Sequence, residues 1–89
     1  MNFQNNWDLH IDPAVVKELK RIPCADSERI VMVMRLLSQD PYFGDIQKMK
    51  GEHDVWRRRI GSYRLFYKIL TDRKIILVFR VERRTSKTY

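Results

Sequence analysis

A cluster of arginines in the second half of the chain is the feature most able to do chemistry. Residues 55–70 read VWRRRIGSYRLFYKIL, and Gly61-Ser62 divides them into two runs rich in aromatic and aliphatic side chains. Glycine at the first of two central positions favours a type II′ turn, so we expect a β-hairpin with residue 59 opposite 64 and 57 opposite 66. Opposed residues share a face. One face is expected to carry Arg57, Arg59, Arg64, Phe66 and Lys68, and the other the apolar Trp56, Ile60, Tyr63, Leu65, Tyr67 and Ile69.

Like charges that face each other across a hairpin destabilise it, so Arg59 opposite Arg64 indicates an anion that offsets the repulsion. Guanidinium groups bind phosphate through paired hydrogen bonds and stack on bases, and Phe66 could add a stacking surface. The alternative is a charged face that only water and counterions cover. We favour a nucleic-acid site because the hairpin concentrates the charge and further basic side chains flank it. These are Lys48 and Lys50 in the preceding loop, and Arg83, Arg84 and Lys87 in the tail that ends with Tyr89.

Arg58 does not fit this pattern. Its place in the alternation puts it on the apolar face, where an isolated charge is costly. Either the side chain lies near a sheet edge and extends its charged end to solvent, or the hairpin register is shifted by one residue. The sequence leaves both possibilities open.

Capping and periodicity predict the two helices that must position this hairpin. Asp12-Pro13 is typical of an N-cap and first helical residue, and predicts a helix that runs to about Arg21. A second helix is expected from a cap at Asp26 or Ser27. Its apolar residues have the spacing 0, 3, 4, 7 of one helix face, and they are Ile30, Val33, Met34 and Leu37.

The strand signals complete the predicted fold. Residues 7–11 alternate as a short strand, 42–54 are expected to form a polar loop, and strands are expected at 55–60, 63–70 and 74–82. The order β-α-α-β-β-β predicts an α+β fold, with two N-terminal helices packed on one face of a mostly antiparallel four-stranded sheet. A single domain is expected over residues 1–89.

Composition narrows the class of partner. The 89 residues include 18 Lys and Arg against 11 Asp and Glu, a net charge of +7 that favours polyanionic partners. We expect no signal peptide and no membrane-spanning or membrane-surface segment, and the single cysteine, Cys24, suits a reducing cytoplasm. The acidic residues are scattered and His10 and His53 lack ligand spacing, so we expect no metal and no cofactor.

The segment 40–67, DPYFGDIQKMKGEHDVWRRRIGSYRLFY, resembles the RelE/ParE toxin superfamily. The matching pieces are Lys48-Met49-Lys50-Gly51, Trp56-Arg57, Arg59, Gly61, Tyr63-Arg64 and Tyr67. The strand order and the basic tail match too, so the likeness covers essentially the whole chain. In the RelE branch, this resemblance implies the toxin of a type II toxin–antitoxin system, an endoribonuclease that cuts mRNA on the ribosome and inhibits translation.

The resemblance also implies residue roles. Catalytic positions fall on Arg57, Arg59, Arg64, Arg84 and Tyr89, with Arg83 in place of Arg84 if the tail is aligned on Tyr89. The expected reaction is metal-independent attack of the 2′-OH on the adjacent phosphate, with arginines stabilising the transition state. Arginine stays protonated and cannot act as a base, so Tyr89 is the candidate acid–base group. RNA-binding roles are expected for Lys48, Lys50, Phe66, Lys68, Arg83 and Lys87.

Two other functions stay open. A ParE-like toxin shares the fold, is not an enzyme and inhibits DNA gyrase; it needs neither Tyr89 nor clustered arginines. A nucleic-acid-binding or antitoxin-bound remnant without activity is the third possibility. The resemblance implies a cognate antitoxin in both toxin branches, an acidic or amphipathic segment over the helices and the sheet, in a toxin–antitoxin hetero-oligomer.

Overall fold

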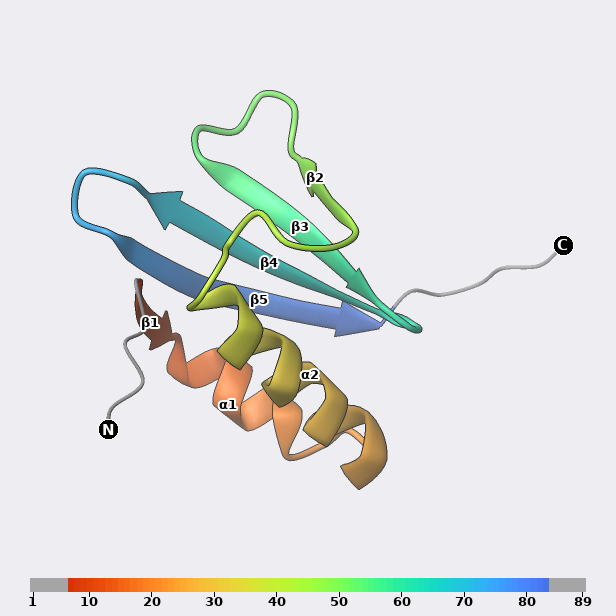
Figure 1. Ribbon diagram of the computed structural model, residues 1–89. Helices are drawn as coiled ribbons and strands as arrows, with labels where there is room; N and C mark the ends of the chain where they lie inside the picture. Colours follow the sequence, from red (N-terminus) through yellow and green to blue (C-terminus); the bar gives the residue numbers. More distant parts are fainter. Residues whose placement is uncertain (1–6, 84–89) are drawn as a thin grey trace, which may run out of the picture.

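The computed structural model describes residues 7–83, which form two helices on one face of a five-stranded sheet (Figure 1). The strands lie in the order β1-β5-β4-β3-β2; only β1 is parallel to its neighbour. The α+β class is therefore confirmed. The elements in chain order are β1 Asp8–Ile11, α1 Pro13–Leu19, α2 Cys24–Leu37, β2 Ile46–Lys48, β3 Val55–Ile60, β4 Tyr63–Leu70 and β5 Ile75–Arg83.

The helix α1 begins as the sequence predicts and ends two residues earlier. Asp12 is the N-cap, and its Oδ1 accepts a hydrogen bond of 2.8 Å from the backbone N–H of Ala14. After Leu19 the chain tightens, since the N–H groups of Arg21 and Ile22 donate three residues back rather than four. Pro23 prevents a further turn because it disfavours helical geometry in the residue before it.

The helix α2 begins at Cys24, so the predicted caps at Asp26 and Ser27 are wrong. Pro23 is the N-cap and its carbonyl accepts from the N–H of Ser27, at 2.9 Å. Asp26 lies within the first turn, where its carboxylate meets the positive end of the helix dipole. The predicted apolar stripe is confirmed, because Ile30, Val33, Met34 and Leu37 are all buried.

The predicted hairpin register is confirmed. In β3 and β4, Arg59 lies opposite Arg64 and Arg57 opposite Phe66. Gly61 has φ +58°, a conformation open to glycine, as the first central residue of a type II′ turn requires.

The expected four-stranded sheet has a fifth strand. Within the predicted loop 42–54, β2 pairs with β3 so that Gln47 lies opposite Arg57 and Lys48 opposite Trp56. Three residues are too few for alternation to reveal a strand, and only Ile46 among them is apolar.

The core lies between the helices and the sheet. The strand residues of this core come from the face of β3, β4 and β5 that meets α1 and α2, and the other face has no helix against it (Figure 1). Among residues 7–83, neither helix is both long and apolar enough to cross a membrane. The core members are Val15, Ile30, Val33, Met34, Leu37, Ile60, Tyr63, Leu65, Tyr67, Ile69, Ile76, Val78 and Val81.

Candidate nucleic-acid interface

Four arginines from three neighbouring strands lie on the sheet face opposite the helices. Two rows of paired residues cross this face. The first row runs Gln47, Arg57, Phe66, Arg80, and the second runs Arg59, Arg64, Glu82. We call Arg57, Arg59, Arg64 and Arg80 together the arginine face.

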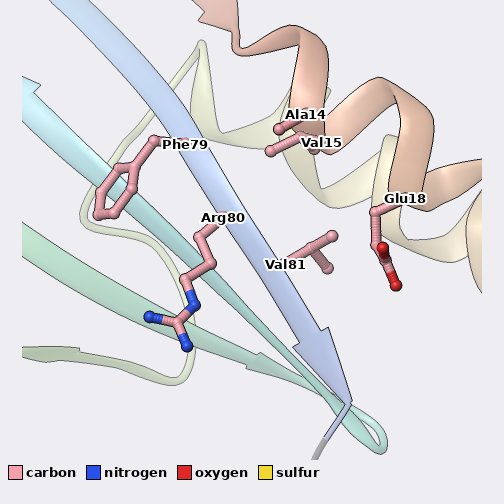
Figure 2. A pocket seen from close by; sticks show the side chains of 6 residues that line it. All are labelled: Ala14, Val15, Glu18, Phe79, Arg80 and Val81. Atoms are coloured by element: carbon pink, nitrogen blue, oxygen red, sulfur yellow. The ribbon is translucent and has the colours of Figure 1, made fainter.

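Arg80 reaches this face through a β-bulge in β5. Phe66 lies opposite Arg80 but Tyr67 opposite Val78, so Phe79 is an extra residue. Strict alternation after Val78 would turn Arg80 toward the helices; instead Arg80 is exposed and Val81 is buried. Figure 2 shows Phe79 and Arg80 on one side of β5, with Val81 on the side of α1. Bulges re-aim side chains in this way and are frequent beside functional sites.

Phe66 supports the arginine face from beneath. Its side chain is only 8% exposed, and the guanidinium of Arg80 lies 5.3 Å from its ring centroid. The ring of Phe79 is 6.5 Å away at a tilt of 51°. The predicted stacking surface at Phe66 is therefore covered, and the half-buried Phe79 is the more accessible ring beside the arginines.

Two carboxylates and one amide meet the four guanidinium groups. Arg57 donates from Nη2 to Oε1 of Gln47, and Nε of Arg59 lies 3.6 Å from a carboxylate oxygen of Asp45. The carboxylate of Glu82 spans two arginines, because Oε2 lies 2.7 Å from Nη2 of Arg80 and Oε1 lies 4.0 Å from Nη1 of Arg64.

These ion pairs leave the arginine face positively charged. The side chains of Arg59 and Asp45 are 53% and 66% exposed, and such solvent-exposed pairs contribute little stability. Each guanidinium has five N–H donors in a fixed fork. Four cations thus face two carboxylates, with most of their donors left for an external anion such as phosphate.

Arg58 lies on the helix side of β3, so the predicted register stands and the shifted one is wrong. Its Nη1 donates to the carbonyl of Phe43 at 2.8 Å, and its guanidinium lies 5.1 Å from the Phe43 ring centroid. The loop before β2 therefore covers this charge at the edge of the sheet. Gly44 has φ +91°, and a Cβ there would lie 2.4 Å from Nη1 of Arg58, so the loop needs glycine at this position.

Beneath this loop, Tyr67 ties the sheet to the chain after α2. It is fully buried, and its hydroxyl donates to the carbonyl of Pro41 at 3.1 Å. Burial raises the pKa of Tyr67 above its ordinary value, and the nearby charge of Arg58 only partly opposes this effect.

Comparison with known proteins decides the family. A model of the ParE toxin of type II toxin–antitoxin systems matches residues 9–87. The chain belongs to the ParE toxin family. RelE1 of Methanocaldococcus jannaschii is 31% identical over 81 residues, which are 88% of this chain and 90% of that protein. The superfamily that the sequence resembles is thus confirmed, and the chain is a RelE-like toxin of a type II toxin–antitoxin system.

Solved structures of relatives agree with this toxin fold. RelE in the archaeal RelE–RelB complex from Pyrococcus horikoshii is 26% identical with a TM-score of 0.81, covering 92% of this chain and 99% of that one. The isolated RelE toxin of E. coli is 18% identical with a TM-score of 0.78, covering 91% of this chain and 87% of its own, and shows the shared fold alone.

Of the other predicted site residues of the toxin, only some lie on the same side of the sheet as the arginine face. Lys68 is exposed on the arginine-face side, beside Val55. Lys48 and Arg83 lie opposite Trp56 and Tyr63, so their positions in the pleat belong to the helix side. Lys50 is exposed in the loop after β2. The predicted Arg84, Lys87 and Tyr89 lie outside the described residues.

The contacts of the two histidines in the described residues are with carboxylates of neighbouring residues and not with the arginine face. Nε2 of His10, on β1, lies 3.1 Å from a carboxylate oxygen of Asp8, and His53 is an exposed loop residue. Within 7–83, no three His, Cys, Asp or Glu side chains form a group that could hold a metal ion.

Sequence reasoning missed Arg80 and Glu82. The signal for Arg80 was present in Val78-Phe79-Arg80-Val81, where the adjacent apolar residues Val78 and Phe79 break the expected alternation. Glu82 carried no such signal in the sequence. Its role depends on contacts with two arginines that come together only in the folded sheet.

Proposed function

We propose that this toxin is a metal-independent endoribonuclease that cuts mRNA on the ribosome and so inhibits translation. The observation that carries the proposal is the arginine face, where β3, β4 and β5 gather four guanidinium groups against two carboxylates. A surface of this kind suits the closely spaced charges of a sugar–phosphate chain.

The chemistry that this surface supports is attack of the 2′-OH on the adjacent phosphate. The pentacovalent transition state gathers negative charge on its oxygens, and preorganised guanidinium donors stabilise that charge. Arg80 is well placed because Glu82 and Phe66 hold its side chain, and Arg64 faces the same carboxylate from the neighbouring strand. The predicted contributions of Arg84 and Tyr89 stand as proposals.

The ribosome is expected to hold the mRNA in the conformation that the cleavage requires. Arginines stabilise charge but transfer no proton, so cleavage of free RNA should be slow. A ribosome that holds the mRNA in a bent, fixed conformation could align the 2′-OH with the phosphate, and such alignment can supply a large part of a rate enhancement. A toxin with this substrate acts in the cytoplasm.

A cognate antitoxin is the expected protein partner. The relatives of known structure include RelE–RelB complexes from Pyrococcus horikoshii and Methanococcus jannaschii. The net charge of +7 suits an acidic or amphipathic antitoxin segment. We expect the two proteins to form a hetero-oligomer in which the antitoxin blocks the toxin.

The test measures translation and DNA supercoiling separately. We expect purified toxin to cut mRNA in a reconstituted translation reaction, and Arg64→Ala to lower the cleavage rate by about 10²–10³-fold. Arg73→Ala is the matched control, because Arg73 is an exposed cation in the turn between β4 and β5. It should cut at the wild-type rate.

The second candidate function is gyrase inhibition, which membership of the ParE toxin family favours. Loss of DNA supercoiling with intact mRNA and intact translation would establish that function and refute ours.

A further inference from the structure

The proposed ribonuclease needs a group that accepts the proton of the 2′-OH. The arginines cannot take it, since a guanidinium stays protonated. Tyr89, the group that the sequence offers for this role, lies outside the described residues. His10 is on β1, opposite Leu77, on the far side of the bulge from Arg80. Among the described residues, the carboxylates that contact the arginine face are those of Asp45 and Glu82.

Glu82 is the better placed of the two carboxylates. Asp45 lies in the loop before β2, is 66% exposed and contacts one arginine at 3.6 Å. Glu82 lies within β5, is 32% exposed and is braced by arginines of two strands. Groups held on strands keep their geometry better than groups on loops.

The two oxygens of Glu82 have different surroundings. Oε2 lies 2.7 Å from Nη2 of Arg80, a contact that fixes the carboxylate. Oε1 lies 4.0 Å from Nη1 of Arg64, outside hydrogen-bond distance, so it can accept a proton from a hydroxyl that enters between them. A phosphate bound by the other N–H groups of Arg64 and Arg80 would lie directly beside Oε1.

We propose that Glu82 is the general base of the RNA cleavage. In this step Oε1 of Glu82 accepts the proton of the 2′-OH, the 2′-oxygen bonds to the adjacent phosphorus, and the bond from phosphorus to the 5′-oxygen breaks. The 5′-oxygen takes a proton from water, and Glu82 returns its own proton to the hydroxide that remains. The products are a 2′,3′-cyclic phosphate and a 5′-hydroxyl. The inference rests on the proposed ribonuclease function.

The experiment compares Glu82→Gln with the wild type in single-turnover cleavage of ribosome-bound mRNA. The amide keeps the size of the side chain but cannot take the proton, so we expect the rate to fall by about 10²–10⁴-fold. Glu18→Gln is the matched control, because Glu18 lies on α1, on the other side of β5 from Arg80 (Figure 2). It should cleave at the wild-type rate.

Two readouts separate a base from a residue that only positions the arginines. Affinity for a 2′-deoxy oligonucleotide, which binds but cannot be cut, should be equal or higher in Glu82→Gln, since one competing anion is gone. Glu82→Asp should keep measurable cleavage and its loss of rate at acid pH, and Glu82→Gln should lose that pH dependence. The charged groups facing Glu82 are Arg64 from β4 and Arg80 from β5, and both stay protonated over this range.

The outcomes distinguish this inference from the proposed function. If Glu82→Gln cleaves at the wild-type rate while Arg64→Ala does not, Glu82 is not the general base, and the proposed ribonuclease function is retained. An equal loss of cleavage and of oligonucleotide binding would make Glu82 a positioning residue and also overturn the base. If the wild-type protein cuts no RNA on ribosomes, the proposed ribonuclease function is refuted, and the base role of Glu82 with it.

Discussion

Three successive arginines of β3 have different fates because a strand turns alternate side chains to opposite faces. Arg57 and Arg59 face outward, where their charge is available to an anion. Arg58 faces inward and is held by the carbonyl and the ring of Phe43. The sequence left the orientation of Arg58 open between this one and a shifted register. It could not show what stabilises the side chain, since the covering loop is 15 residues away in the chain.

At the same scale, the buried Tyr67 should make stability fall at alkaline pH. Above about pH 10 the tyrosine of the unfolded chain loses its proton, whereas the raised pKa keeps Tyr67 protonated in the folded state. The unfolded state then binds fewer protons, so this contribution to stability is complete below that pH and is lost as the pH rises above it.

Urea unfolding of Tyr67→Phe and wild type at about pH 8 and about pH 11 checks this expectation. The wild type should lose more stability between the two pH values than the variant. Tyr42→Phe is the control, because Tyr42 is 47% exposed and should keep the wild-type pH dependence. Identical pH dependence in Tyr67→Phe and wild type would refute the assignment.

At the scale of elements, strict alternation predicted β3 and β4 with their register, and it failed in β5. The bulge at Phe79 inverts the alternation from that residue on. The strand β2 was not predicted, because it has only three residues and its extended conformation depends on pairing with β3. The sequence thus predicted three of the four arginines of the arginine face.

The loop before β2 offers a prediction at this scale. Gly44 and Gly51 both have positive φ, but a Cβ at Gly44 would meet Arg58, and one at Gly51 would meet nothing within 4 Å. Gly51→Ala should cost about 1–2 kcal/mol of unfolding free energy through backbone strain alone. Gly44→Ala should cost roughly 1–3 kcal/mol more, because Arg58 must move.

A double-mutant cycle with Arg58→Met tests the cause. If Arg58 creates the extra cost, Gly44→Ala should be less damaging in the Arg58→Met background than in the wild type. If urea unfolding shows the same loss of unfolding free energy for Gly44→Ala and Gly51→Ala, the Arg58 side chain can move aside without loss of stability, and the explanation is wrong.

At the scale of the whole molecule, the two faces of the sheet have different roles. The face against α1 and α2 buries the core and fixes the strands, and the opposite face, without a helix over it, presents the arginines (Figure 1). The composition predicted a polyanionic partner, but the position of the charge came from the hairpin and the bulge. The central claim is therefore that these guanidinium groups act as one anion-binding surface.

The salt dependence of binding to a 2′-deoxy oligonucleotide tests that claim most directly, since it counts the cations that meet phosphates without any cleavage. Arg57→Ala, Arg59→Ala, Arg64→Ala and Arg80→Ala should each lower the slope of log affinity against log salt by roughly one. Arg73→Ala removes the same charge from the turn between β4 and β5 and should leave the slope unchanged. A slope that falls as much for Arg73→Ala as for the four arginines would show that net charge, and not the arginine face, binds the nucleic acid.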